Sequence, residues 1–190
     1  MNALKLKKGT ARKSAYNLRA NYEDQTETHT LTVLVDNEAG VLARVIGLFS
    51  GRGYNIESLT VAETDHAAHL SRITIVTTGT PEVIEQIKAQ LARIVPVHAV
   101  NDLTVECESV ERELALIKVA GTGEKRVEAL RTSEVFRASV VDSTLESFVF
   151  ELTGAPEKID AFINLMRPLG LSDVARTGVA AIARGVDESA

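Results

Sequence analysis

The sequence predicts an α+β protein with two βαββαβ domains in tandem, and three observations support this fold class. Short stretches in which apolar and polar residues alternate, typical of half-buried strands, lie between stretches with the apolar spacing of helices. The chain has 190 residues, which is enough for one or two compact domains. Residues 78–85 (TGTPEVIE) and 153–160 (TGAPEKID) are similar at an offset of 75, which indicates an internal duplication.

The first domain is expected at residues 28–104. Thr80 suits the N-cap of its second helix and Pro81 the first helical position, and Pro96 should end that helix. The expected elements are, in order, a strand at 29–35, a helix at 41–49, strands at 56–61 and 70–77, a helix at 81–95 and a strand at 97–105. This order, β-α-β-β-α-β, is the ferredoxin-like arrangement.

The second domain is expected at residues 114–185, after an acidic linker at 105–113. Its elements follow partly from the offset of 75, which places strand on strand and helix on helix. They are a strand at 114–119, a helix at 125–138, a strand at 139–143, a strand with Phe148 and Phe150, a helix with Phe162 and Met166, and a strand at 174–183. Gly178 within the last strand predicts a bulge or bend.

Charge is unevenly distributed along the chain. Residues 1–20 contain six basic and no acidic residues, whereas the rest has 15 basic against 26 acidic residues, a net charge of −11. We expect residues 1–27 to be a mobile basic extension, because they lack a clear apolar period, and residues 186–190 to be a short tail. Since an acidic body repels phosphate backbones, no nucleic-acid partner is expected.

The location of the protein is predicted from the absence of apolar segments. No stretch approaches the ~18 consecutive apolar residues of a membrane span, and the N-terminus has no apolar stretch like that of a signal peptide. We therefore expect no membrane partner and a location in the bacterial cytoplasm. A location in an organelle is the alternative, if the basic extension is a targeting peptide.

Few side chains suggest catalysis or metal binding. His66 and His69 have a spacing that could bind a metal, but no other ligand motif accompanies them, so exposed turn residues are the favoured interpretation. Residues 121–125 (GTGEK) lack the spacing of a phosphate-binding loop, and the single cysteine, Cys107, cannot form an internal disulfide. We expect no catalytic residue, no metal and no cofactor in this chain.

One segment has the features of a small-molecule site. Residues 36–42 join a predicted strand to the start of a helix, where backbone N–H groups and the helix dipole suit a small anion such as a carboxylate. Gly40 would let a ligand approach the backbone closely. The alternative is an ordinary turn with Asn37 as the N-cap and Gly40 for conformational freedom, and the spacing alone favours this alternative.

Residues 36–59 (DNEAGVLARVIGLFSGRGYNIESL) closely resemble the small, regulatory subunits of acetohydroxyacid synthase, also called acetolactate synthase. The resemblance continues through SRITI at 71–75, VEREL at 110–114, FR at 136–137, VD at 141–142 and ARTGV at 175–179. It covers about residues 28–185. It implies an N-terminal ACT domain, which is a ferredoxin-like module that binds amino acids, followed by a second domain of related topology.

The resemblance also implies a partner and an activity. Subunits of this family are not catalytic by themselves. They bind the large catalytic subunit, which holds thiamine diphosphate, magnesium and FAD, raise its activity, and make it sensitive to feedback inhibition by valine. The expected partners are therefore the large subunit, a second copy of this chain that pairs through the ACT domain, and valine.

The family's effector pocket corresponds to one loop of this sequence and to two residues from a paired ACT domain across a dimer interface. The loop consists of Asn37, Glu38, Ala39, Gly40, Val41 and Leu42, and the residues facing it are Asn55 and Ile56. The sequence leaves two other interpretations. A stand-alone amino-acid sensor is the main alternative. A pair of RNA-binding domains is disfavoured by the acidic charge and by an aromatic content of only 4%.

Overall fold

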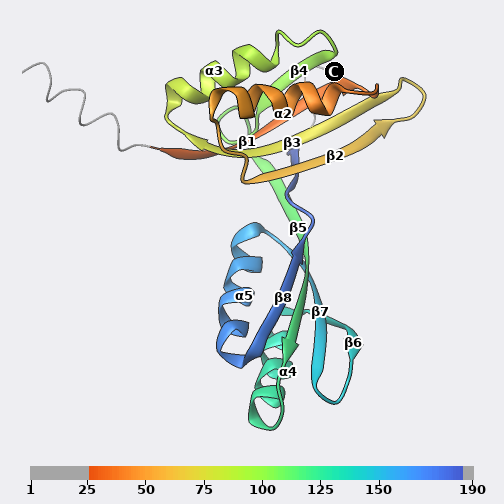
Figure 1. Ribbon diagram of the computed structural model, residues 1–190, viewed down its shortest axis with the longest axis vertical. Helices are drawn as coiled ribbons and strands as arrows, with labels where there is room; N and C mark the ends of the chain where they lie inside the picture. The colour runs from red at the N-terminus through yellow and green to blue at the C-terminus, as the bar shows by residue number, and fades with distance from the viewer. Residues whose placement is uncertain (1–25, 186–190) are drawn as a thin grey trace, which may run out of the picture.

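The computed structural model describes residues 26–185, which form two α+β lobes with the second lobe beneath the sheet of the first (Figure 1). The basic extension and the C-terminal tail expected from the sequence lie outside the described residues, except that Glu27 is the first residue of β1. Within residues 26–185, no helix is long and apolar enough to cross a membrane.

The first lobe has the order β-α-β-β-α-β that the sequence predicts. Its elements are β1 (Glu27–Asp36), α2 (Val41–Arg52), β2 (Ser58–Asp65), β3 (Leu70–Gly79), α3 (Pro81–Leu91) and β4 (Val97–Asp102). The strands form an antiparallel sheet in the order β2-β3-β1-β4, so β2 and β4 are its edges. Alternate residues of β1 and β3 pack against the buried stripes of α2 and α3, with Phe49, Ile75 and Ile87 among the fully buried side chains.

The second lobe repeats this plan. Its elements are β5 (Ser109–Ala120), α4 (Glu124–Phe136), β6 (Ser139–Ser143), β7 (Ser147–Gly154), α5 (Pro156–Gly170), β8 (Leu171–Arg176) and β9 (Ala180–Ala183). The sheet order is β6-β7-β5-β8, and its core contains Phe150, Phe162 and Met166, as the offset of 75 predicts. The predicted α+β class with two βαββαβ units is therefore confirmed.

Several predicted boundaries differ from the structure. The second helix, α3, ends at Leu91 rather than near Pro96. After its C-cap, Ala92, the hydrogen bonds run to the third preceding residue, from Arg93 N–H to Gln90 and from Ile94 N–H to Leu91. Thr80 occupies the N-cap position, but its side chain makes no capping hydrogen bond. The hairpin strand β2 begins at Ser58, two residues later than expected, and β4 ends at Asp102, three residues earlier.

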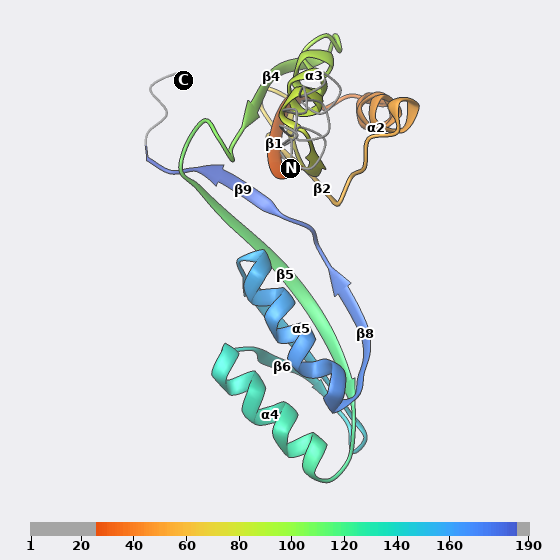
Figure 2. The same cartoon turned by 90° about the vertical axis from the view of Figure 1, so that its left-hand side faces the viewer.

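The chain between the lobes is not the simple linker that the sequence predicts at 105–113. β5 begins at Ser109, and its residues 109–112 pair with β9, while its later residues pair with β7 and β8. The predicted single strand at 174–183 is divided into β8 and β9 at Gly178, which has a left-handed φ of +86°. Figure 2 shows the two connecting segments, β5 and β8–β9, running side by side between the lobes.

An ion pair between the half-exposed Arg176 and the buried Glu113 lies where these segments diverge. The Arg176 guanidinium donates to both carboxylate oxygens of Glu113, at 2.6 Å for the Nε bond, and also donates to Asp160 at 2.7 Å. Glu113 is only 4% exposed, so its charge depends on this partner. The hydrogen bonds to Glu113 raise the pKa of Arg176 above its ordinary value, against the lowering effect of partial burial.

Replacing Arg176, whose partner carboxylate is buried, should destabilise the protein more than replacing an arginine whose partner is exposed. Arg176→Met leaves the Glu113 carboxylate buried without its partner, and we expect a loss of about 3 kcal/mol in the free energy of unfolding. Arg131→Met is the matched control, because Arg131 and its partner Glu128 are both exposed, and it should cost less than about 0.5 kcal/mol. Urea unfolding measures both values, and equal losses would contradict the structural role of the pair.

Candidate functional site

The loop from Asn37 to Gly40 is exposed and is held at its base by hydrogen bonds. The Asn37 N–H donates to the His69 carbonyl at 2.6 Å, which ties the loop to the start of β3. The preceding residue, Asp36, accepts from His98 Nε2 at 2.6 Å. Glu38 forms an exposed ion pair with Arg44 at 3.4 Å. These contacts fix the position of the loop relative to the sheet, while its side chains stay open to solvent.

Gly40 is the N-cap of α2, so the prediction of Asn37 as the cap is wrong, whereas the predicted need for conformational freedom at Gly40 agrees with its positive φ. It adopts φ +90° and ψ −8°, and no side chain caps the helix. Helix geometry leaves the first N–H groups of α2 without an i−4 partner, and Val41 N–H makes only a long 3.4 Å bond to Glu38. The first turn of α2 contains no acidic residue. Its positive dipole end is therefore available to a carboxylate.

The space above Gly40 is open. A Cβ atom built on Gly40 would meet no heavy atom within 4 Å, so a side chain there would extend into the region in front of the helix start. The two residues that follow Gly40 are apolar, but they differ in exposure. Val41 is buried in the core and anchors the helix, whereas Leu42 is 38% exposed on the outer face.

Asn55 and Ile56 lie beyond the opposite end of α2. The helix ends at Gly53, which has the left-handed conformation typical of a C-cap. The Asn55 carbonyl accepts from the Thr77 hydroxyl at 2.6 Å, its side chain is exposed, and Ile56 packs against the core. A 12-residue helix is about 18 Å long. Within one chain, the loop and Asn55 are therefore too far apart to contact the same small ligand.

The corresponding position of the second lobe is chemically different. Gly123 precedes α4 with φ +60° and ψ −133°, and Glu124 occupies the first turn. This carboxylate already lies at the positive end of the helix and would repel a second one. Arg126 lies over the Phe148 ring at 3.7 Å from its centroid, so its guanidinium is used in packing. The two helix starts therefore offer different sites in the same fold.

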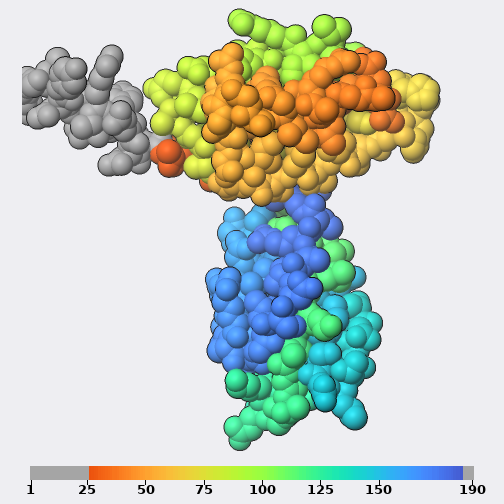
Figure 3. Space-filling model, in the orientation of Figure 1, coloured from red at the N-terminus to blue at the C-terminus, as the bar shows by residue number. Residues whose placement is uncertain are grey.

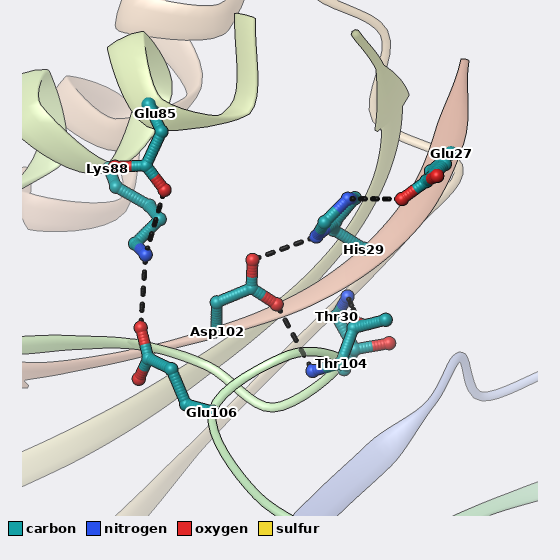
Figure 4. A network of polar contacts seen from close by, with 8 residues as sticks. All are labelled: Glu27, His29, Thr30, Glu85, Lys88, Asp102, Thr104 and Glu106. Atoms are coloured by element: carbon teal, nitrogen blue, oxygen red, sulfur yellow. Dashed lines mark hydrogen bonds and ion pairs between the residues drawn. The ribbon is translucent and has the colours of Figure 1, made fainter. Parts of the chain in front are cut away.

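A buried polar network that the sequence did not reveal fixes the exit of β4 (Figure 4). His29 Nδ1 lies 2.7 Å from Asp102 Oδ2, and both side chains are buried. The other Asp102 oxygen accepts from the Thr104 N–H, and the Thr104 hydroxyl accepts from the Thr30 N–H. Sequence alone gives no signal for this pairing, because 73 residues separate the histidine from the aspartate.

Lys88 binds the crossover, which is the chain at residues 103–108 that connects β4 to β5. It donates to Glu106 at 2.9 Å and to Glu85 at 3.1 Å (Figure 4). The pKa of Lys88 is raised above its ordinary value, chiefly by the hydrogen bond to Glu106 and against the effect of desolvation. These bonds attach the chain leaving β4 to α3, so the first residues of the crossover are part of the first lobe.

The other candidate residues lie apart from these clusters. His66 pairs with Glu63 at 2.7 Å in the exposed turn between β2 and β3, and His69 lies in the same turn. Among residues 26–185, no three His, Cys, Asp or Glu side chains lie close enough together to hold a metal ion. Cys107 is exposed in the crossover between β4 and β5.

Comparison with known proteins gives matches over both lobes. Residues 31–99 match the family model of the AHAS small subunit-like ACT domain, and residues 112–185 match that of the small subunit of acetolactate synthase. A probable acetolactate synthase small subunit from Archaeoglobus fulgidus is 49% identical over 83% of this chain and 97% of its own length. The small subunit of acetolactate synthase isozyme 3 from Escherichia coli is 47% identical over 82% of this chain and 94% of its own length.

A solved structure agrees with these matches. The crystal structure of the acetolactate synthase small subunit from Thermotoga maritima is 39% identical, with a TM-score of 0.74, over 85% of this chain and 99% of that one. The relatives match over nearly their whole lengths, and the match spans both lobes. The resemblance stated from residues 36–59 is confirmed, and the chain belongs to the family of acetolactate synthase small subunits.

Proposed function

We propose that this chain is a regulatory subunit that activates the large catalytic subunit of acetolactate synthase and makes it sensitive to inhibition by valine. The large subunit would hold thiamine diphosphate, magnesium and FAD, and this chain would hold none of them. Membership in the small-subunit family supports a partnership with a large subunit. The effector site would be the loop Asn37–Leu42 of one chain together with Asn55 and Ile56 of a second chain.

The observation that most supports effector binding is the open start of α2. The backbone N–H groups that follow Gly40 have no side-chain cap and no acidic neighbour in the first turn, so they can receive the carboxylate of an amino acid. The exposed amide oxygen of Asn55 can accept from the ammonium group. Leu42 and Ile56 offer apolar surface for a branched side chain.

A two-chain site also fits the distribution of exposed apolar residues. The edge strand β2 has an exposed valine, Val61, and α2 exposes Leu42 and Ile46, which are four residues apart and so lie on one face. Two copies paired about a two-fold axis through β2 would place their α2 helices antiparallel. The start of one α2 then lies near the end of the other, which brings the loop of one chain to Asn55 of its partner.

The dimer can be tested by sedimentation of the purified chain at micromolar concentration with valine. The unchanged chain should be at least a dimer, and Ile46→Glu should shift it to monomer, because the substitution places a charge in the apolar interface. Val95→Glu is the control, since Val95 is 95% exposed in the turn between α3 and β4. A monomeric unchanged chain, or equal effects of both substitutions, would argue against the proposed pairing.

Substitution of Gly40 tests the carboxylate position. Gly40→Asp would place a carboxylate in front of the helix start, so we expect valine affinity to fall at least about tenfold, or 1.4 kcal/mol, below that of Gly40→Asn. The asparagine variant is the matched control, because it has nearly the same shape and the same unfavourable positive φ without the charge. Calorimetry measures the affinity, and both variants should still activate the large subunit. Equal valine affinity of the two variants would exclude this carboxylate site.

Asn55→Ala tests the second half of the site. Removing a hydrogen bond to a charged ligand group costs about 1.5–3 kcal/mol, so valine affinity should fall about tenfold to more than a hundredfold. The fold should be unaffected, because the contact that Asn55 makes with β3 uses its backbone carbonyl. Unchanged valine affinity in a folded variant would remove Asn55 from the site.

The function as a whole is tested with a large subunit from the same family. Acetolactate formation should be faster with this chain than without it, and added valine should lower the rate only when the chain is present. The chain alone should form no acetolactate, because it would not hold the thiamine cofactor that the condensation of pyruvate needs. If valine binds the chain but no large subunit co-purifies with it or is activated by it, the stand-alone amino-acid sensor is the better interpretation.

A further inference from the structure

The lobes contact each other through the segment between β8 and β9. Gly178 lies directly against β2, because a Cβ atom built there would be 2.7 Å from Ser58 Oγ and 2.9 Å from Thr60 Oγ1. Its φ of +86° is also unfavourable for residues with a side chain. Glycine is therefore needed at this position for two separate reasons, the backbone conformation and the close approach to β2.

Hydrogen bonds attach this segment to both lobes. The Val179 N–H donates to Ser58 Oγ at 3.0 Å, a bond across 121 residues of sequence. On the other side, Thr177 is tied to β5 of the second lobe, because its N–H donates to the Leu114 carbonyl at 3.0 Å and its hydroxyl accepts from the Leu114 N–H at 3.2 Å. Ser58 of β2 is therefore connected to Leu114, in the central strand of the second sheet, through the three consecutive residues 177–179.

Apolar packing surrounds this contact. Val179 and Ala181 are buried against Val76 of β3 and Leu103, which follows β4. This cluster, the only one in residues 26–185 with buried members from both lobes, is small. The space-filling view shows that the lobes meet through a narrow connection (Figure 3). We call the contact of residues 177–183 with the first lobe the waist. Beside it lies a cleft of about 660 Å³, lined by residues of both lobes that include Glu57, Ser58, Arg176 and Gly178.

The strand β2 also connects this contact to the proposed effector residues. Asn55 lies three residues before Ser58, and successive bonds hold the intervening chain to β3. Thr77 Oγ1 donates to the Asn55 carbonyl at 2.6 Å, and the Glu57 N–H donates to the Val76 carbonyl at 2.8 Å. Val76 pairs with Ser58 in the sheet and belongs to the apolar cluster under the waist. A change at Asn55 therefore has a short, bonded route to Ser58.

We propose that the contact of Gly178 and Val179 with Ser58 transmits the occupancy of the effector site to the second lobe. This inference rests on the proposed function, because it takes Asn55 as an effector contact. Tightly packed contacts shift between discrete arrangements rather than deforming gradually, so a small displacement of β2 changes how the waist is packed. Gly178 is a positioning residue in this scheme, since it touches neither the effector nor the reacting groups.

The test compares Gly178→Ala with Gly185→Ala in the full chain. Both glycines have similar positive φ values, +86° and +81°, so both substitutions impose a similar backbone cost. A Cβ atom at Gly185 would meet nothing within 4 Å, whereas one at Gly178 would collide with Ser58. The difference between the two variants therefore reports on the contact with β2.

The first readout is amide hydrogen exchange with and without valine. In the unchanged chain and in Gly185→Ala, valine should slow exchange both at residues 37–42 and across the waist at residues 177–183. In Gly178→Ala, it should slow exchange only at residues 37–42. The second readout is the rate of acetolactate formation by the complex with the large subunit. The factor by which saturating valine lowers this rate should be at least about fivefold smaller with Gly178→Ala than with the unchanged chain.

Ser58→Ala provides an independent variant if Gly178→Ala does not fold. It removes the oxygen that accepts from Val179 without adding volume, so the fold should persist while the exchange response at residues 177–183 weakens. When both single variants fold, their effects on valine inhibition should not add, because they remove the same contact. Additive effects would place transmission elsewhere.

The outcomes separate the two hypotheses. If valine neither protects residues 37–42 of the unchanged chain nor inhibits its complex, the proposed effector function is wrong. If the unchanged chain responds to valine and folded Gly178→Ala responds equally in both readouts, the transmission inference is overturned while the effector function stands. The inference is also overturned if Gly185→Ala loses the response at residues 177–183 as fully as Gly178→Ala does.

Discussion

The arrangement of the two lobes depends on β5, a single strand that changes its pairing along its length. Its first residues pair with β9 under the first lobe, and its later residues form the centre of the second sheet. Glu113 lies where the two pairings meet, and its buried carboxylate is paired with the half-exposed guanidinium of Arg176. Leaving this carboxylate buried without its partner would be costly, so the pair stabilises the point at which β8 and β9 separate. The position of Gly178, two residues later, follows from that point.

The duplicated fold is used differently in its two halves. Both halves place a glycine with positive φ before the first helix of the lobe, but only α4 has an acidic residue in its first turn. In the second lobe, Arg126 packs on Phe148 and Glu124 occupies the helix start, so the corresponding place is closed to a carboxylate. Of these two helix starts, only that of α2 therefore has neither a side-chain cap nor an acidic residue in its first turn. Exposed apolar residues of the second lobe, including Val135 and Leu145, are instead available for a protein partner.

Most of the fold could be predicted from the sequence because its strands and helices have strong apolar periods. The alternation around Val33 and the stripe from Val41 to Phe49 correspond directly to β1 and α2. The ion pair beside the waist could not be predicted. Glu113 looks like a solvated residue of an acidic linker until Arg176, 63 residues away, is placed beside it. The loop at Gly40 could be predicted from its strand-to-helix position and from the family resemblance of residues 36–59. That Gly40 is itself the cap depends on a backbone angle that spacing does not reveal.

The geometry of a two-chain site has a consequence for how a regulatory signal would travel. A ligand can shift an equilibrium only through its different affinities for the two states, so the relevant contacts are those that change. The loop before α2 is held to β3 and β4 by short bonds from Asn37 and Asp36, and Val41 is buried in the core, so this half of the site is rigid. Asn55 lies in the exposed segment before the edge strand β2, close to Ser58 and the waist. In the proposed dimer, the loop of one chain would receive the carboxylate, and a displacement of the partner's Asn55 would reach Ser58 through the bonds that hold its segment to β3.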